Sequence, residues 1–143
     1  MARALRVLLI DDNNDDITLI QLAAQSAGGG HTFCSVDRAK KAIDLLEHKP
    51  AESLPDLLLV DLRMPEMDGF QFLRWLQQHH RLRIPAVVLS SSFLEQDIDE
   101  AYRLGARSFL SKPFAYEELV RDMKSFLAFW SECLLPNRQK SEA

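Results

Sequence analysis

The stretch "LLIDDNNDD", residues 8–16, decides the fold because it joins an apolar run directly to a group of carboxylates. A short aliphatic run of this kind is typical of a buried strand. Asp and Asn behind such a run end the strand, form a turn and cap the next helix. On this interpretation Asp11 and Asp12 only build the turn, and residues 13–16 supply a cap and negative charge at a helix start. The rest of the chain has to show whether the carboxylates do more.

The same order of apolar run and helical pattern recurs along the chain. Strands are predicted at residues 5–10, 32–36, 57–60, 86–89 and 108–110. Helices are predicted to begin near Asp15, Arg38, Gly69, Leu94 and Tyr116. Five such units with short connections predict an α/β fold, a doubly wound five-stranded parallel sheet with helices on both faces.

Local signals mark several of these boundaries. Asp37 and Asp68 are predicted caps, and Ser92 with Glu95 has the spacing of a capping box. The glycines at 28–30 are predicted to break the chain after the first helix, and Gly105 to end the fourth.

Composition predicts one globular domain, at residues 1–136, followed by a polar tail at 137–143. The chain has 143 residues, of which 47% are hydrophobic and 27% charged, enough to bury a core. A net charge of −4 disfavours nucleic acid as a partner. Two cysteines are too few for a disulfide scaffold, and no apolar run suits a signal peptide or a membrane span. We therefore expect a cytoplasmic protein.

The predicted sheet brings five chemically active residues to one edge. Ligands of open α/β sheets bind at the carboxyl ends of the strands. Those ends carry Asp11, Asp12, Asp61, Ser90 and Lys112. Three close carboxylates repel one another unless a hard cation offsets their charge, and Mg²⁺ suits such oxygen ligands. With a lysine and a hydroxyl to bind phosphoryl oxygens, the arrangement predicts phosphoryl transfer to a carboxylate.

Four stretches in this order resemble the receiver domains of two-component response regulators. They are "LLIDD" (8–12), "LLLVDLRMPEMDG" (57–69), "VVLSS" (87–91) and "SFLSKPF" (108–114). The resemblance covers almost the whole chain and implies a flavodoxin-like (βα)5 receiver fold.

The resemblance also implies a role for each matching residue. Asp61 would be the phosphoacceptor and Asp12 a direct Mg²⁺ ligand. Asp11 would act on the metal largely through water, and the carbonyl of Arg63 would complete the metal site. These assignments make the carboxylates of the opening stretch part of a metal site.

On the other side of the site, Ser90 would be the switch hydroxyl, Lys112 the phosphate-binding lysine and Phe109 the switch aromatic. An ordinary core role for Phe109 stays open. The family pattern further implies a cis peptide bond between Lys112 and Pro113.

The implied function is that of a single-domain response regulator, not a conventional enzyme. It would accept a phosphoryl group from a histidine kinase or phosphotransfer protein and signal through its own surface. The spacing before "LPDLLLVD" (54–61) and the ending "FWSECLLP" (129–136) resemble regulators that partner bacterial phytochromes. The alternative is a receiver-like interaction module that works without phosphorylation. A phosphatase of the haloacid dehalogenase type is disfavoured, because Arg63 stands where that class has a second Asp.

Other conspicuous residues are given plain structural interpretations. Asp15 and Asp16 are interpreted as helix-start and surface charges, and Asp97, Asp99 and Glu100 as a solvated helix face. The four histidines, at positions 31, 48, 79 and 80, are interpreted as solvated or structural.

The last helix is predicted to run from Tyr116 to Leu135, about 30 Å, so that its final turns project beyond the sheet. These turns carry Phe129, Trp130, Leu134 and Leu135. We expect a homodimer through the fourth helix, the fifth strand and this helix. A chain end folded back over its own domain is the alternative.

Overall fold

A computed structural model describes residues 2–79 and 81–136 of the chain; the predicted polar tail at 137–143 lies outside these residues. The strands are β1 (Arg6–Ile10), β2 (Thr32–Val36), β3 (Leu57–Val60), β4 (Ala86–Ser90) and β5 (Ser108–Ser111). The helices are α1 (Asn14–Ala27), α2 (Ala39–His48), the short 3₁₀ turn η1 (Ala51–Ser53), α3 (Gly69–Gln78), α4 (Glu95–Arg103) and α5 (Tyr116–Glu132). All five predicted strands are present.

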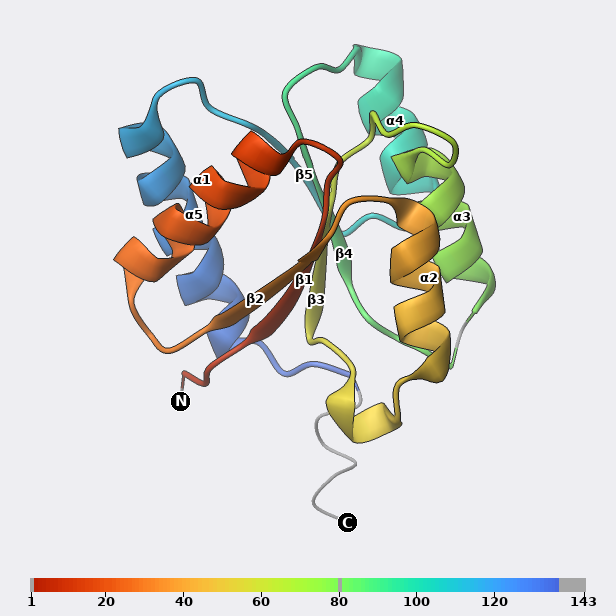
Figure 1. The fold of residues 1–143 in the computed structure, drawn as a ribbon, viewed down its shortest axis with the longest axis horizontal. Helices are drawn as coiled ribbons and strands as arrows, with labels where there is room; N and C mark the ends of the chain where they lie inside the picture. The colour runs from red at the N-terminus through yellow and green to blue at the C-terminus, as the bar shows by residue number, and fades with distance from the viewer. Residues whose placement is uncertain (1, 80, 137–143) are drawn as a thin grey trace.

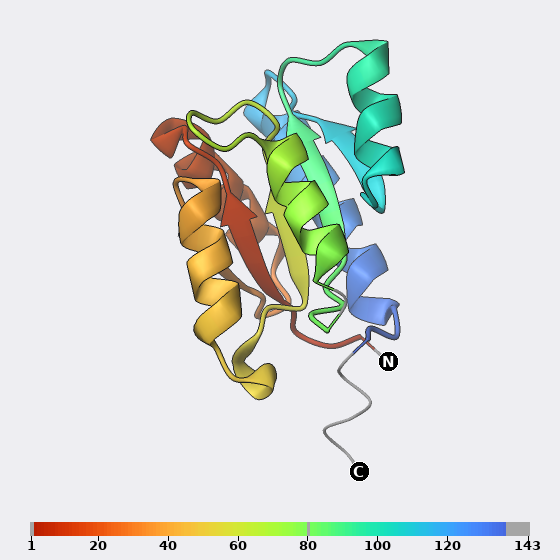
Figure 2. The same cartoon turned by 90° about the vertical axis from the view of Figure 1, so that its right-hand side faces the viewer.

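The strands form one parallel sheet in the order β2-β1-β3-β4-β5. Helices α1 and α5 cover one face of the sheet and α2, α3 and α4 cover the other (Figures 1 and 2). Along β1, Val7 and Leu9 point to the first face, whereas Leu8 and Ile10 point to the second. This alternation divides the core into two layers, as expected for a sheet covered on both faces. The predicted doubly wound α/β fold is confirmed.

The predicted helix caps are right at some ends and wrong at others. Asn13 and Asp68 cap α1 and α3 by accepting hydrogen bonds from Asp16 N and Gln71 N. Asp37 does not cap α2, because its carboxylate instead pairs with Lys41 at 2.9 Å. The predicted capping box at Ser92 is also wrong, since α4 begins only at Glu95.

The predicted length of the last helix is wrong as well. Helix α5 ends at Glu132, and Cys133 adopts an extended conformation that turns the chain. Leu135 is then buried in the α1/α5 layer, while Phe129 and Leu134 stay exposed. The chain end therefore folds partly back over its own domain, because Leu135 removes apolar surface from water there.

No helix in the described part of the chain is long and apolar enough to span a bilayer.

Candidate functional site

The sheet's backbone hydrogen bonds continue past the strand ends and position the predicted site residues. The N–H of Asp61 donates to the Ile10 carbonyl at 2.9 Å, and the N–H of Asp11 donates to the Val36 carbonyl at 3.2 Å. At the other side, the N–H of Lys112 donates to the Ser90 carbonyl at 3.0 Å. Each of these three residues follows its strand by one position, so backbone hydrogen bonds that continue the sheet hold its position. The structure thus places these residues at one edge of the sheet, as predicted.

Gly69, the first residue of α3, lets the helix approach the loop after β3 very closely. Its N–H donates to the Leu62 carbonyl at 3.0 Å. A Cβ atom at this position would lie 2.5 Å from the Asp61 carbonyl oxygen and 2.8 Å from the Leu62 Cα. Only glycine avoids this overlap, which explains the "DG" at the end of the 57–69 stretch.

Asp11, Asp12 and Asp61 form a compact acidic cluster, with one carboxylate oxygen from each within 4.8 Å of the others. Asp11 and Asp61 are buried and Asp12 is exposed. Burial raises the pKa of Asp61 to about 6, with further contributions from the charges of Asp11 and Asp12, although the Lys112 charge acts in the opposite direction. Hard oxygen donors that repel one another at this spacing fit a divalent cation such as Mg²⁺.

Lys112 is the cation of the site. Its Nζ donates to Asp11 Oδ2 at 2.6 Å and to Asp16 Oδ2 at 2.9 Å, and it lies 3.8 Å from Asp61 Oδ2. Burial disfavours its charge, but the bonds to Asp11 and Asp16 and the charge of Asp61 raise the pKa of Lys112 above its ordinary value. The lysine is therefore charged and held inside the acidic cluster.

The predicted cis bond between Lys112 and Pro113 is wrong for this structure, since the described residues include no cis peptide bond. The trans isomer is the lower-energy form of an X-Pro bond, and with it Lys112 already reaches the carboxylates.

The interpretation of Asp16 as a surface charge is also wrong. Its side chain is 31% exposed and pairs with Lys112 across the site. The sequence held a signal that was missed: the first turn of a helix that follows β1 directly lies at the same edge of the sheet as Asp11.

Ser90 is the last residue of β4, and Phe109 lies on the neighbouring strand β5. The buried Ser90 hydroxyl donates to the Ser92 carbonyl at 3.0 Å. The Phe109 ring is partly buried and packs edge-on against Phe93, with 5.3 Å between ring centroids. Both side chains thus contact the segment between β4 and α4.

Arg63 connects the loop after β3 to the start of α4. Its guanidinium lies 2.5 Å from Asp97 Oδ2, and the same carboxylate oxygen accepts the N–H of Leu94 at 2.8 Å. Asp97 is buried, so its interpretation as part of a solvated face is wrong. The helical pattern did not reveal this burial, because the Asp97 side chain turns back and accepts a backbone N–H at the start of α4.

The histidines have the structural roles predicted where the structure describes them. His31 Nδ1 accepts the Leu5 N–H at 2.9 Å, and His48 and His79 lie against backbone carbonyls of their own helices. His80 lies outside the described residues.

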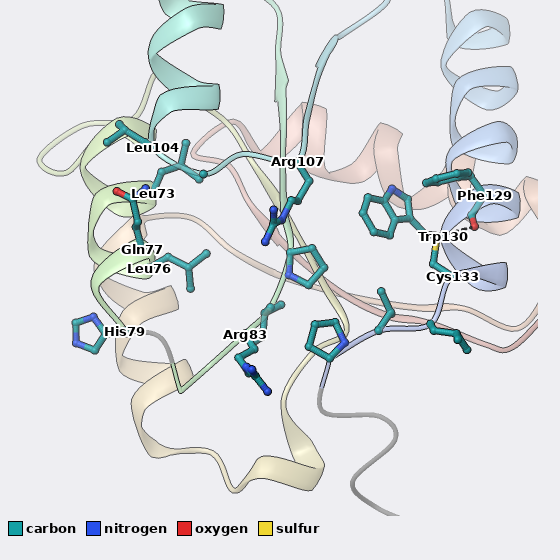
Figure 3. Close-up of a pocket in the computed structure, with 16 residues that line it drawn as sticks. Leu73, Leu76, Gln77, His79, Arg83, Leu104, Arg107, Phe129, Trp130 and Cys133 are labelled. Atoms are coloured by element: carbon teal, nitrogen blue, oxygen red, sulfur yellow. Dashed lines mark hydrogen bonds between the residues drawn. The ribbon is translucent and has the colours of Figure 1, made fainter.

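A second concavity lies at the opposite edge of the sheet, before the starts of β4 and β5 (Figure 3). It is an open hollow of about 1080 Å³. Its walls come from the ends of α3 and α5 and from the segments before β4 and β5, and they include Arg83, Arg107, Phe129 and Trp130. This hollow was not predicted from the sequence, and its lining lacks the acidic residues of the carboxyl edge.

Together, the fold and the site define a doubly wound α/β domain that holds an acidic, cation-competent cluster and a charged lysine at one edge of its sheet. The family model described as the response regulator receiver domain matches residues 7–124. The chain belongs to the response regulator receiver domain family.

Individual relatives agree with this assignment. The probable methanogenesis regulatory protein FilR2 of Methanothrix harundinacea is 35% identical over 87% of this chain and 82% of its own length. The crystal structure of the phosphorylated cyanobacterial phytochrome response regulator RcpA is 33% identical, with a TM-score of 0.84 over 93% of this chain and 99% of that one. The Mn²⁺-bound form of response regulator Rcp1, a Synechocystis protein, is 29% identical, with a TM-score of 0.81 over 92% of this chain and 99% of that one. Two other curated relatives are about twice as long, since the chain spans 54% and 52% of them.

The predicted family and the predicted flavodoxin-like receiver fold are both confirmed. The chain is a two-component signalling protein, and its acidic pocket is of the kind that binds a divalent metal in this family.

Proposed function

We propose that the chain accepts a phosphoryl group on Asp61 from a histidine kinase or phosphotransfer protein and signals through its own surface. The observation that carries the proposal is the placement of Asp61 between two further carboxylates and Lys112, whose Nζ lies 3.8 Å from Asp61 Oδ2. A carboxylate nucleophile needs neighbouring cations to accept a dianionic group, and this site supplies one and fits a second.

Each site residue has a definite part in the transfer. Asp61 Oδ attacks the phosphorus in line, the phosphorus–nitrogen bond of the donor phosphohistidine breaks, and its electron pair leaves on the imidazole. Lys112 donates hydrogen bonds to the phosphoryl oxygens. Asp11, Asp12, Asp61 and the carbonyl of Arg63 would hold Mg²⁺. When bound, the cation offsets the charge of the carboxylates and of the phosphoryl oxygens.

Ser90 and Phe109 then carry the signal away from the site. The Ser90 hydroxyl exchanges the Ser92 carbonyl for a phosphoryl oxygen, and the ring of Phe109 turns into the space that Ser90 leaves. Because Phe109 contacts Phe93, this shift favours a different arrangement of the surface at α4 and β5. Hydrolysis of the acyl phosphate ends the signal, so that the chain is a self-dephosphorylating acceptor and not a conventional enzyme.

The proposed partners follow from the relatives. RcpA is a cyanobacterial phytochrome response regulator, so a bacterial phytochrome with kinase activity is the proposed donor for this chain. Such a donor would place the protein in the cytoplasm. The proposal also includes a homodimer that forms through α4, β5 and α5. It further states that the chain does not bind nucleic acid.

The test is incubation with acetyl phosphate and Mg²⁺, followed by intact-mass measurement of the wild type and Asp61→Asn. We expect a Mg²⁺-dependent phosphate adduct in the wild type alone. No adduct in the wild type would favour the phosphorylation-independent interaction module, and turnover of unrelated phosphate esters would favour a phosphatase.

A further inference from the structure

Lys112 has one more carboxylate partner than the proposed transfer requires. Asp11 and Asp61 follow strands, but Asp16 reaches the lysine from the first turn of α1. Its bond to Lys112 Nζ measures 2.9 Å, against 2.6 Å for Asp11. Nothing in the proposed transfer gives Asp16 a role.

The donors of the ammonium are limited. A lysine has three N–H donors, and Asp11 and Asp16 each accept one of them. The third cannot form a good hydrogen bond with Asp61, since 3.8 Å is too long for one. A phosphoryl group on Asp61 would bring several acceptor oxygens that compete for the same donors.

Asp16 is the partner that can be displaced more easily. Asp11 is fully buried, and its other oxygen accepts the Asn13 N–H at 3.0 Å. Asp16 is 31% exposed, and within the described residues Lys112 is its sole ion-pair partner. Releasing a partly exposed carboxylate to water costs less than leaving a buried one without its partner.

We infer that Asp16 is a positioning residue that holds Lys112 in the unphosphorylated state and competes with the phosphoryl group for it. Asp16 therefore sets how readily the site accepts phosphate. This inference rests on the proposed function of Asp61 and deepens it by naming a control of the same site.

Asp15 provides a matched control. It lies in the same first turn of α1, carries the same charge and is exposed, and it makes no ion pair with another residue that the structure describes. Asp15→Asn and Asp16→Asn therefore change the net charge and the helix-end charge equally. Only Asp16→Asn weakens the contact with Lys112.

The experiment measures the rate of adduct formation with acetyl phosphate and Mg²⁺ in the wild type, Asp16→Asn, Asp15→Asn and Asp16→Glu. We expect Asp16→Asn to react about threefold to tenfold faster, the effect of one partly screened charge-assisted hydrogen bond. Asp15→Asn should stay near the wild type, and Asp16→Glu should return towards it. Equal rates for Asp16→Asn and Asp15→Asn, or a slower Asp16→Asn, would overturn the inference.

A second readout uses metal-free protein and does not depend on phosphorylation. The NMR chemical shifts of the Lys112 side chain should change in Asp16→Asn and match the wild type in Asp15→Asn, because only Asp16 accepts a hydrogen bond from Lys112 Nζ. Unchanged shifts in both variants would overturn the contact itself.

The two failures can be told apart. An adduct in the wild type with no difference between the two Asn variants refutes the role of Asp16 alone. The other case is a wild type that forms no adduct although all four proteins show cooperative thermal unfolding. The proposed function and the proposed competition of Asp16 for Lys112 then fail together.

Discussion

The two edges of the sheet carry surfaces of opposite chemistry. At the carboxyl edge, Asp11 and Asp61 are buried and lie beside a charged lysine. At the amino edge, a wide hollow combines aromatic side chains with the exposed Arg83 and Arg107 (Figure 3).

The difference lies in how each surface is built. The carboxylates leave the sheet one residue past their strands, so hydrogen bonds such as Asp61 N to Ile10 O fix them. The hollow is lined by the ends of α3 and α5 and by the segments before β4 and β5, which are far apart in sequence. A site built by strand ends can be predicted from sequence, whereas a hollow between helix ends depends on tertiary structure.

The largest expected effect would come from removing individual carboxylates at the carboxyl edge. Asp61→Asn and Asp12→Ala should each lower adduct formation with acetyl phosphate by more than about a hundredfold. The first variant lacks the nucleophile, whereas the second only binds the cation more weakly. Raising the Mg²⁺ concentration should therefore restore Asp12→Ala in part and Asp61→Asn not at all, as measured by intact mass. Equal rescue of both variants would show that the two roles are wrongly assigned.

The next effect concerns the helix that closes over this edge. Gly69→Ala should lower the free energy of unfolding by about 2 to 4 kcal/mol, because the new methyl group would overlap the Asp61 and Leu62 backbone. Urea unfolding measures the loss. Gln78→Ala, an exposed change in the same helix, serves as the control and should shift stability by less than about 0.5 kcal/mol. A Gly69→Ala protein as stable as this control would refute the close approach.

A smaller effect should appear in the pH dependence of stability without metal. The pKa of Asp61 is raised from 3.8 to about 6, so the folded state keeps a proton that the unfolded state loses first. The contribution of Asp61 to metal-free stability should therefore fall as the pH rises from about 4 to 6, and Asp61→Asn should remove this contribution. At pH 7.5 in EDTA we expect the variant to be more stable than the wild type by about 2 kcal/mol, a value reduced for partial solvent screening.

Denaturant unfolding at several pH values measures this difference. The difference in stability between the two proteins should shrink towards pH 4, where residue 61 is uncharged in the folded wild type as well as in the folded variant. A wild type that is as stable as Asp61→Asn at pH 7.5 would show that the protein environment does not destabilise the charged Asp61 carboxylate.

The sequence predicted the sheet and the strand-end residues, because these depend on local patterns. The five strands differ from prediction by at most one residue at either end, and Asp11, Asp12, Asp61, Ser90 and Lys112 lie at one edge. Periodicity and the order of strands are sufficient to specify both.

The two missed ion pairs beside the site join segments far apart in sequence. Lys112 and Asp16 are 96 residues apart, and Arg63 and Asp97 are 34 apart. An acidic residue on a helix looks solvated in the sequence, and only the packed fold shows which cation lies opposite it. The need for glycine at position 69 is likewise a tertiary fact, since the overlap is with the loop after β3.

The smallest expected effect concerns the amino edge and the proposed dimer. Trp130 is a poor probe of dimerisation, because it is half-buried against the α1/α5 layer and packs on Phe126. Phe129 is a better probe: it is 64% exposed and contacts Trp130 edge-on, so Phe129→Ser should change the free energy of unfolding by less than about 0.5 kcal/mol.

If the end of α5 contributes to the interface, Phe129→Ser should weaken the dimer about tenfold, since burying one aromatic ring contributes one to a few kcal/mol. Light scattering over a range of concentrations measures this, with and without acetyl phosphate. Leu22 is 46% exposed on α1 and lies outside the proposed interface, so Leu22→Ser is the control and should leave the dimer unchanged.

A wild type that is monomeric under all these conditions would refute the dimer. A dimer that is insensitive to Phe129→Ser would confine the interface to α4, β5 and the first turns of α5. In that second case the hollow at the amino edge would have no part in association, and the contrast between the two edges would lie in their chemistry alone.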